Sequence, residues 1–265
     1  MGAKVITITS GKGGVGKTTT TANLGVALAR LGKKTVVIDA DIGLRNLDVV
    51  MGLENRIVYD LVDVVEGRCR LRQAMIKHKQ FPDLYLIPAA QTRDKTSVSP
   101  ADMIHITDKL RSDFDFIIID SPAGIERGFR NAVAPADEVL IVTNPEVSAV
   151  RDADRIVGLL EAEHKNPGKL ILNRLKPAMV KKGEMLSADD VVDILALEII
   201  GIVPEDDHVI PASNSGIPVT LNENSHAGVA FRNIARRLTG EDVALMDLET
   251  NSGFFQRLAK FFGGR

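Results

Sequence analysis

The fold is decided by the stretch Ser10-Gly11-Lys12-Gly13-Gly14-Val15-Gly16-Lys17-Thr18-Thr19. Its spacing, Gly-x-x-x-x-Gly-Lys-Thr, places glycines where the backbone must curl so that successive amides point at one anion. An apolar run precedes it at Lys4 to Thr9, and a helical pattern follows it from Thr18 to Leu31. A strand, a glycine-rich loop and a helix N-terminus in this order predict a phosphate-binding loop.

Apolar runs of strand length recur as far as Leu238, with amphipathic stretches between them such as Ser187 to Leu195, which Ser187 is suited to cap. Most runs are continuously apolar, which is typical of strands covered on both faces. The runs are Lys4–Thr9, Lys34–Asp39, Leu84–Pro88, Phe114–Asp120, Glu138–Thr143, Lys169–Asn173 and Ile199–Val203. The alternation predicts a single α/β P-loop NTPase domain over residues 1–238, with a mostly parallel twisted sheet, helices on both faces and ligands at the carboxyl ends of the strands.

Composition excludes several classes of protein. A formal net charge of −2 gives no overall basic field that would draw nucleic acid or anionic lipid to the whole surface. The single cysteine, Cys69, can form neither an internal disulfide nor a Cys-x-x-Cys pair, which favours a reducing compartment. The sequence shows no secretion signal and no apolar stretch of membrane-spanning length. We therefore expect a cytoplasmic protein.

Two lysines lie in the glycine-rich loop. Lys17 is expected to contact the β- and γ-phosphates of a nucleotide, and the hydroxyl of its neighbour Thr18 is expected to bind Mg²⁺. Lys12 is an additional cation that this kind of loop does not require. Beside a polyphosphate it would stabilise the charge that develops during phosphoryl transfer, whereas its alternative is a solvated surface lysine.

Three aspartates follow predicted strands. Asp39 and Asp41 end or follow one apolar run, and Asp120 ends another. Because the carboxyl ends of parallel strands share one edge of the sheet with the loop, we expect these carboxylates near the phosphates, where Mg²⁺ is held by one or two carboxylates and by the substrate. A strand-end aspartate can also be a turn or cap residue, and this remains the alternative for Asp41.

The base of the nucleotide is indicated by a later strand end. A guanine site of the GTPase kind would read Asn-Lys-x-Asp, but this chain reads Asn173-Arg174-Leu175-Lys176, with a lysine in place of the acidic group that would bind guanine. Adenine is therefore favoured, and with it ATP. Asparagine at a strand end is also a common turn former.

The C-terminal segment differs from the rest of the chain. A polar connector, residues 239–252, precedes residues 253–265, which hold four of the nine phenylalanines. At 100° per residue the apolar side chains fall in an arc of roughly 120°, opposite the basic ones. The apolar set is Phe254, Phe255, Leu258, Phe261 and Phe262, and the basic set is Arg257 and Lys260. This pattern predicts an amphipathic membrane-targeting helix for anionic lipid; a terminal helix docked on the protein body is the alternative.

Four segments together resemble one family. They are Lys12-Gly13-Gly14-Val15-Gly16-Lys17-Thr18, the stretch from Asp39 to Asp48, the stretch from Asp120 to Glu126, and the stretch from Thr143 to Asp152. The chain resembles the MinD family of deviant Walker A ATPases, which are membrane-associated and place the bacterial division septum, and the resemblance covers nearly the whole chain.

The resemblance implies roles for particular residues. It implies that Lys12 reaches across a dimer interface to the partner's nucleotide and that Asp120 acts on Mg²⁺ through water. It places Asp39 in the magnesium shell and gives Asp41 the positioning of the attacking water. By the same resemblance, Asn173 and the loop beginning at Pro204 bind the base.

The resemblance also implies partners: an ATP-bound homodimer, the division inhibitor MinC, in many bacteria MinE, and the cytoplasmic face of the plasma membrane. Asp152 would belong to the partner-binding surface, although a solvated aspartate at a helix start is its alternative.

A ParA-like DNA partition ATPase is the nearest rival to this interpretation. An apolar C-terminal stripe argues against it, because binding to the DNA backbone needs clustered lysine and arginine. An iron–sulfur carrier would need more than Cys69, and a scaffold whose assembly is controlled by ATP is the remaining rival.

Overall fold

The structure, a computed structural model, describes residues 2–163, 165 and 168–246. Eight strands form one sheet in the order β3-β4-β2-β5-β1-β6-β7-β8. The strands are β1 (Lys4–Thr9), β2 (Thr35–Asp39), β3 (Ile76–Lys77), β4 (Leu84–Ile87), β5 (Phe116–Asp120), β6 (Glu138–Thr143), β7 (Lys169–Leu175) and β8 (Ile199–Pro204). Neighbours are parallel except β3 and β4, which are antiparallel. The strand before the glycine-rich loop, β1, is therefore central.

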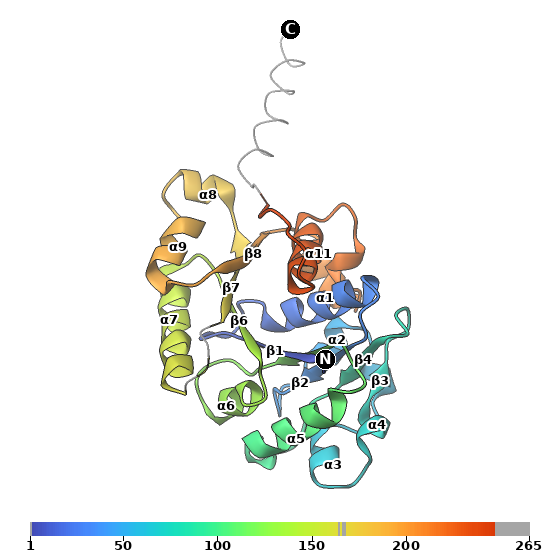
Figure 1. The fold of residues 1–265 in the computed structure, drawn as a ribbon. Helices are drawn as coiled ribbons and strands as arrows, with labels where there is room; N and C mark the ends of the chain where they lie inside the picture. Colours follow the sequence, from blue (N-terminus) through green and yellow to red (C-terminus); the bar gives the residue numbers. More distant parts are fainter. Residues whose placement is uncertain (1, 164, 166–167, 247–265) are drawn as a thin grey trace.

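Helices cover both faces of this sheet (Figure 1). One face packs against α1 (Lys17–Arg30), α2 (Leu47–Val50), α10 (Val209–Asn214) and α11 (His226–Leu238). The other packs against α3 (Leu61–Val65), α4 (Leu71–Ala74), α5 (Pro100–Leu110), α6 (Arg127–Val133), α7 (Val147–Ala162), α8 (Pro177–Lys181) and α9 (Ala188–Leu195). Short 3₁₀ turns are η1 (Glu54–Arg56), η2 (Lys95–Ser97) and η3 (Val219–Leu221). The predicted α/β fold with two covered faces is confirmed.

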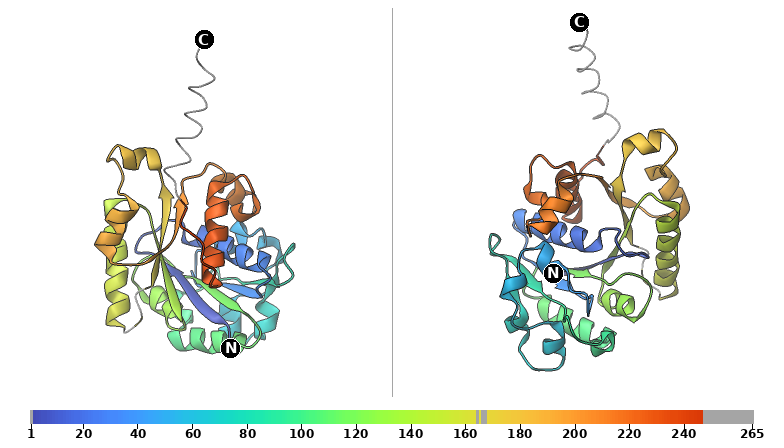
Figure 2. Two further views of the ribbon diagram at one scale, coloured as in Figure 1. Left: turned by 45° about the horizontal axis from the view of Figure 1, so that its top comes forward. Right: turned by 180° about the vertical axis from the view of Figure 1, so that it is seen from behind.

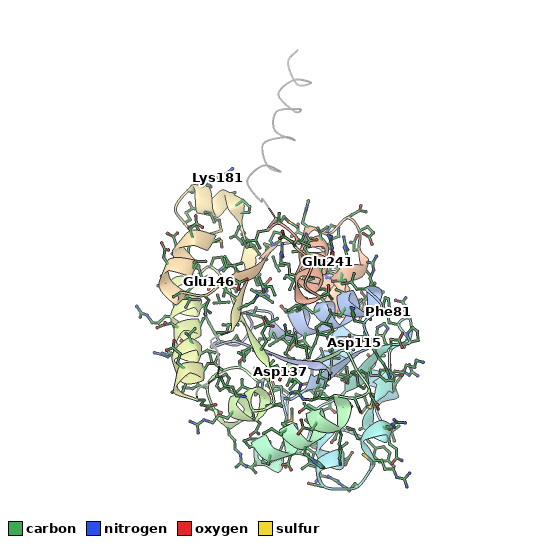
Figure 3. All side chains as sticks on the ribbon, in the orientation of Figure 1. Phe81, Asp115, Asp137, Glu146, Lys181 and Glu241 are labelled. Carbon is green, nitrogen blue, oxygen red and sulfur yellow. The ribbon has the colours of Figure 1, made fainter. Side chains whose placement is uncertain are left out.

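The strand side chains explain why both faces need cover. In β1, Ile6 and Ile8 join the apolar cluster under α1 and α11, whereas Val5 joins the cluster under α5. Successive side chains of a strand point to opposite faces, so a strand that is apolar throughout must be buried on both. The charged side chains Asp137, Glu146 and Glu241, which Figure 3 labels, are exposed and lie outside this apolar core.

Most predicted boundaries hold within a residue or two. All seven predicted strands exist, but β5 begins at Phe116 rather than Phe114, and β7 continues to Leu175. Strand β3 was not predicted, because two residues are too short to show a strand pattern. Ser187 caps α9 as predicted, since its hydroxyl accepts a hydrogen bond from the Asp190 amide at 3.1 Å.

The first residues after α11 lie on the protein body. The guanidinium of Arg237 donates to the carbonyl oxygens of Val243 and Ala244, and Met246 packs against the core cluster of α11. The rest of the predicted connector and the predicted amphipathic helix, residues 253–265, lie outside the described residues. Among the helices of the described part, none is long and apolar enough to cross a membrane.

Candidate functional site

Two glycines shape the loop between β1 and α1. Gly16 has a φ of 104°, and a Cβ there would lie 2.3 Å from Nδ2 of Asn173. At Gly11 a Cβ would lie 2.1 Å from the carbonyl oxygen of Asp152 on α7. Both positions therefore exclude any side chain. No side chain caps the first turn of α1, so its amides remain available to an anion held by the loop.

Lys17 and Thr18 begin α1 beside Asp120. Lys17 is buried, and its burial lowers the pKa of its ammonium group, although the negative charges of Asp120 and Asp41 oppose this. The Thr18 hydroxyl donates to Oδ2 of Asp120 at 2.7 Å, and the Thr21 hydroxyl donates to Oδ1 at 3.2 Å. The structure thus brings together the predicted phosphate lysine, the predicted magnesium hydroxyl and the predicted carboxylate, and it adds Thr21, which sequence reasoning missed.

Asp39 and Asp120 form a buried carboxyl pair. They are directly paired in the register of β2 and β5, and each is 1% exposed. Burial raises the pKa of Asp39 to about 6 and that of Asp120 to about 7, and the charge of Asp39 adds to the shift of Asp120. Two buried carboxyl groups this close do not both ionise easily, and a cation beside them would favour the form in which both are charged.

The loop after β2 is anchored by Asp39. Oδ1 accepts from the amide of Asp41 at 2.9 Å, and Oδ2 accepts from the amides of Asn46 and Leu47 at 3.2 Å. Asp39 therefore lies near the predicted magnesium site while its oxygens hold the backbone of residues 41–47. Sequence spacing gave no sign of this anchoring role, because it depends on how the loop folds back.

Hard oxygen donors converge at this edge. The Thr18 hydroxyl and the Asp120 carboxylate are the donor types that Mg²⁺ prefers, and they lie next to the loop that would hold the phosphates. The residues present fit a magnesium ion. In the described part of the chain no three His, Cys, Asp or Glu side chains form a metal-binding group.

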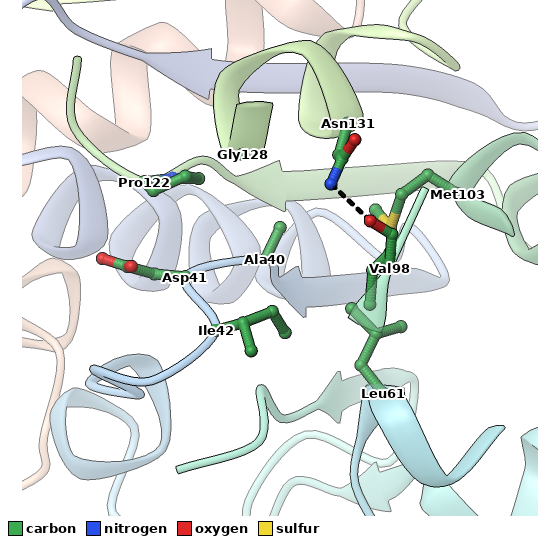
Figure 4. Close-up of a pocket in the computed structure, with 9 residues that line it drawn as sticks. All are labelled: Ala40, Asp41, Ile42, Leu61, Val98, Met103, Pro122, Gly128 and Asn131. Carbon is green, nitrogen blue, oxygen red and sulfur yellow. Dashed lines mark hydrogen bonds between the residues drawn. The ribbon is translucent and has the colours of Figure 1, made fainter. Parts of the chain in front are cut away.

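Asp41 lies at the mouth of a small apolar pocket between β2 and α6. Figure 4 shows its carboxylate pointing away from Ile42, Leu61 and Val98, which line the pocket wall. The Asn131 amide donates to the carbonyl oxygen of Val98 at 2.8 Å and closes the far side. Asp41 therefore lines this pocket, and its negative charge also acts on Lys17 in the glycine-rich loop.

A second pocket lies beside the glycine-rich loop, where a base was predicted. Its lining includes both predicted base-site residues, Asn173 and Pro204, together with Gly16, Thr19, Arg174 and Phe231. The Asn173 amide also donates to the carbonyl oxygen of Val15 at 2.7 Å, which ties β7 to the loop. Phe231 comes from α11, and no sequence signal pointed to it.

Asp206 fixes the loop after β8 that forms part of this pocket. Burial would raise the pKa of Asp206, but hydrogen bonds from the amides of His208 and Ala227 and from the Ser225 hydroxyl hold it well below its usual range. The charged carboxylate thereby joins the pocket loop to the N-terminus of α11, where a negative charge is favoured.

Two predicted site residues meet at α7: Lys12 of the glycine-rich loop contacts this helix, and Asp152 is part of it. The Lys12 ammonium lies 3.4 Å from the hydroxyl of Ser148, on the first turn of α7. Asp152 is half-buried, its carboxylate lies 3.4 Å from Arg155, and its backbone lies against Gly11. The predicted partner-binding residue is thus built against the glycine-rich loop. Ser148 was not singled out from the sequence.

Comparisons with known proteins agree with this geometry. The model of a family described as "AAA domain" matches residues 3–170. The septum site-determining protein MinD of Bacillus subtilis is 56% identical over 265 residues, covering 99% of this chain and 99% of that protein. The chain belongs to the MinD family.

Two solved MinD structures share the fold. The MinC:MinD cell division protein complex from Aquifex aeolicus is 52% identical, with a TM-score of 0.87, and covers 92% of this chain and 99% of that one. MinD of Pyrococcus horikoshii, complexed with Mg-ADP, is 30% identical, with a TM-score of 0.81, and covers 89% of this chain and 96% of that one. The predicted resemblance to septum site-determining ATPases of the MinD family is confirmed.

Proposed function

We propose that this chain is an Mg²⁺-dependent ATPase that dimerises when ATP is bound, attaches to the cytoplasmic face of the plasma membrane, and recruits MinC there to position the division septum. Hydrolysis then releases it. The observation that carries this proposal is the pairing of Thr18 with Asp120 beside a glycine-rich loop that contains both Lys12 and Lys17.

In the proposed hydrolysis, residues at one edge of the sheet have separate roles. The amides of residues 11–19 and the Lys17 ammonium hold the phosphates, and Thr18 and Asp120 would hold Mg²⁺. Magnesium, when bound, neutralises charge on the phosphate oxygens. Asp41 orients a water molecule toward the γ-phosphate, giving ADP and phosphate. Asp39 keeps the loop of Asp41 in place through its three backbone hydrogen bonds.

The proposed dimer would cover the nucleotide edge. Exposed apolar side chains follow three central strands there: Leu44 after β2, Ile125 after β5 and, on the other side of β1, Val147 after β6, each about half or more exposed. Apolar side chains gathered around a polar site are typical of a surface that a protein partner covers. Lys12, exposed beside them, would then reach the nucleotide of the second subunit.

The proposals of partner binding and membrane binding are supported by the relatives and by the sequence. The solved Aquifex aeolicus relative is a complex of MinC with MinD, which supports MinC as a partner, with Asp152 on α7 as part of the contact surface. MinE would act on the same cycle. The amphipathic pattern of residues 253–265 supports lipid binding, and two copies in a dimer would bind about 10²- to 10⁴-fold more tightly than one because of avidity.

Vesicle sedimentation tests this proposal. The full chain and a version ending at Ser252 are spun with vesicles containing anionic lipid, in ATP or in ADP. We expect the full chain to sediment strongly only in ATP and the shorter chain to stay in the supernatant while it still hydrolyses ATP. Equal binding in ATP and ADP would refute the coupling. Salt-sensitive binding to DNA without vesicle binding would favour the ParA-like alternative.

A further inference from the structure

A cationic segment follows β7. Between residues 174 and 184 the chain carries four cationic side chains and one carboxylate, Glu184, whereas the whole chain has a net charge of −2. The four cations are Arg174, Lys176, Lys181 and Lys182, and all four residues are exposed. Arg174 also lines the base pocket, whereas the proposed ATPase mechanism uses none of the three lysines. We call the four residues the α8 cations.

The backbone that carries the α8 cations is held in place by packing. Pro177 begins α8, Val180 packs against the core cluster of α7 and α9, and the Lys176 amide lies 3.3 Å from Sδ of Met185. Among acidic neighbours, Glu205 lies 4.0 Å from Arg174 and offsets part of its charge. A surface whose backbone is already ordered loses little conformational entropy when it meets a partner.

The end of the described chain is fixed near the same place. The Arg237 guanidinium donates to the carbonyl oxygens of Ile200, Val243 and Ala244 at 2.8, 2.8 and 2.6 Å, which fastens the chain after α11 to β8. In Figure 1 and in both views of Figure 2, α8 and the last described residues lie at the same end of the molecule. Lys181 projects outward there (Figure 3). The described chain therefore ends on the side of the α8 cations.

We propose that the α8 cations are a second contact with anionic lipid, made by the folded domain when the C-terminal segment is on the membrane. This inference rests on the membrane attachment proposed above. Each lysine or arginine near an anionic membrane surface strengthens binding by about fivefold at low salt. Since the chain end is tied to β8, membrane attachment of the tail would bring α8, rather than another face, within a Debye length of the lipid headgroups.

The test compares two double variants of the full chain in ATP. Lys181→Gln with Lys182→Gln removes two α8 cations. Lys77→Gln with Lys79→Gln removes two exposed lysines at β3, the opposite edge of the sheet, and serves as the matched control. Vesicles of phosphatidylcholine with about 30% phosphatidylglycerol are titrated at low salt and at 1 M salt, where screening shortens the reach of charges to about 3 Å.

We expect the α8 variant to bind at least about fivefold more weakly at low salt, with the difference disappearing at 1 M salt. The β3 variant should bind as the unaltered chain does, and both should hydrolyse ATP normally without lipid. If the α8 variant binds vesicles like the unaltered chain, the inference is wrong while membrane attachment stands. If the unaltered chain itself fails to bind, or a chain ending at Ser252 binds equally, the proposed attachment fails. A loss of duplex DNA binding with vesicle binding intact would also overturn the lipid assignment.

Discussion

At the scale of single residues, the site depends on positions where the surrounding atoms and charges restrict which side chain can be present. Gly16 must be glycine because of its positive φ and because Asn173 occupies the place of a side chain. Asp120 is buried, yet two threonine hydroxyls donate to it and Lys17 acts on it electrostatically. These features make the edge of β1 and β5 a preorganised receptor for phosphate and a cation.

Replacing Gly16 by alanine is expected to weaken both folding and nucleotide binding. The left-handed backbone alone costs about 1–2 kcal/mol, and the new Cβ would displace the Asn173 amide from Val15. Urea unfolding and titration with a fluorescent ATP analogue measure the two effects. Gly158→Ala is the control: Gly158 lies in α7 with nothing within 4 Å of an added Cβ, so it should be stabilising by about 0.5–1 kcal/mol. Unchanged nucleotide affinity in Gly16→Ala would contradict this account of the loop.

The buried carboxyl pair predicts how stability without nucleotide depends on pH. A raised pKa lets the folded chain keep a proton that the unfolded chain, with a carboxyl pKa of about 4, has lost. Between about pH 4 and about pH 7 the folded state therefore binds more protons, and the free energy of unfolding falls as pH rises. Asp120→Asn should flatten this fall and be the more stable chain at pH 8. Urea unfolding at pH 5 and pH 8 checks the slope, and identical slopes for both chains would show the account to be wrong.

At the scale of elements, the sequence-based prediction succeeded wherever one local pattern decides the outcome. Continuous apolar runs predicted the seven main strands, and Ser187 predicted the start of α9. The pattern could not predict β3, which pairs over two residues, or the contribution of Phe231 to the base pocket, which depends on how α11 packs. Nor could it predict that Lys12 contacts Ser148 on α7. Contacts between distant elements arise from packing, which no local pattern encodes.

The capping of α9 gives a prediction at this scale. Ser187 and Asp190 each accept a hydrogen bond from the other's backbone, so Ser187→Ala should lower the free energy of unfolding by about 1 kcal/mol without changing ATP hydrolysis. Ser112→Ala is a suitable control, because its hydroxyl contacts only Asp113 at 3.4 Å among the described residues. Chemical denaturation of both variants measures their free energies of unfolding. If Ser187→Ala is as stable as Ser112→Ala, the cap does not stabilise α9.

At the scale of the whole molecule, one edge of the sheet gathers the phosphate loop, the carboxyl pair, the base pocket and exposed apolar side chains, which include Leu44 and Val147. The end of the described chain is fastened to β8 and lies at the end of the molecule that carries α8. Under the proposed function, a second copy covering the nucleotide edge joins two C-terminal segments in one particle, and the resulting avidity makes membrane attachment depend on ATP.

The most direct test is the mass of the full chain in solution, measured by light scattering during size-exclusion chromatography in ATP and in ADP. Asp41→Ala should stay dimeric in ATP while it releases almost no phosphate, because only the positioning of water is lost. Lys12→Ala should stay monomeric, since the proposed contact with the second subunit's nucleotide is gone. The account predicts twice the monomer mass in ATP and the monomer mass in ADP. A chain that hydrolyses ATP yet keeps the monomer mass in both nucleotides, with Asp41→Ala monomeric as well, would contradict it.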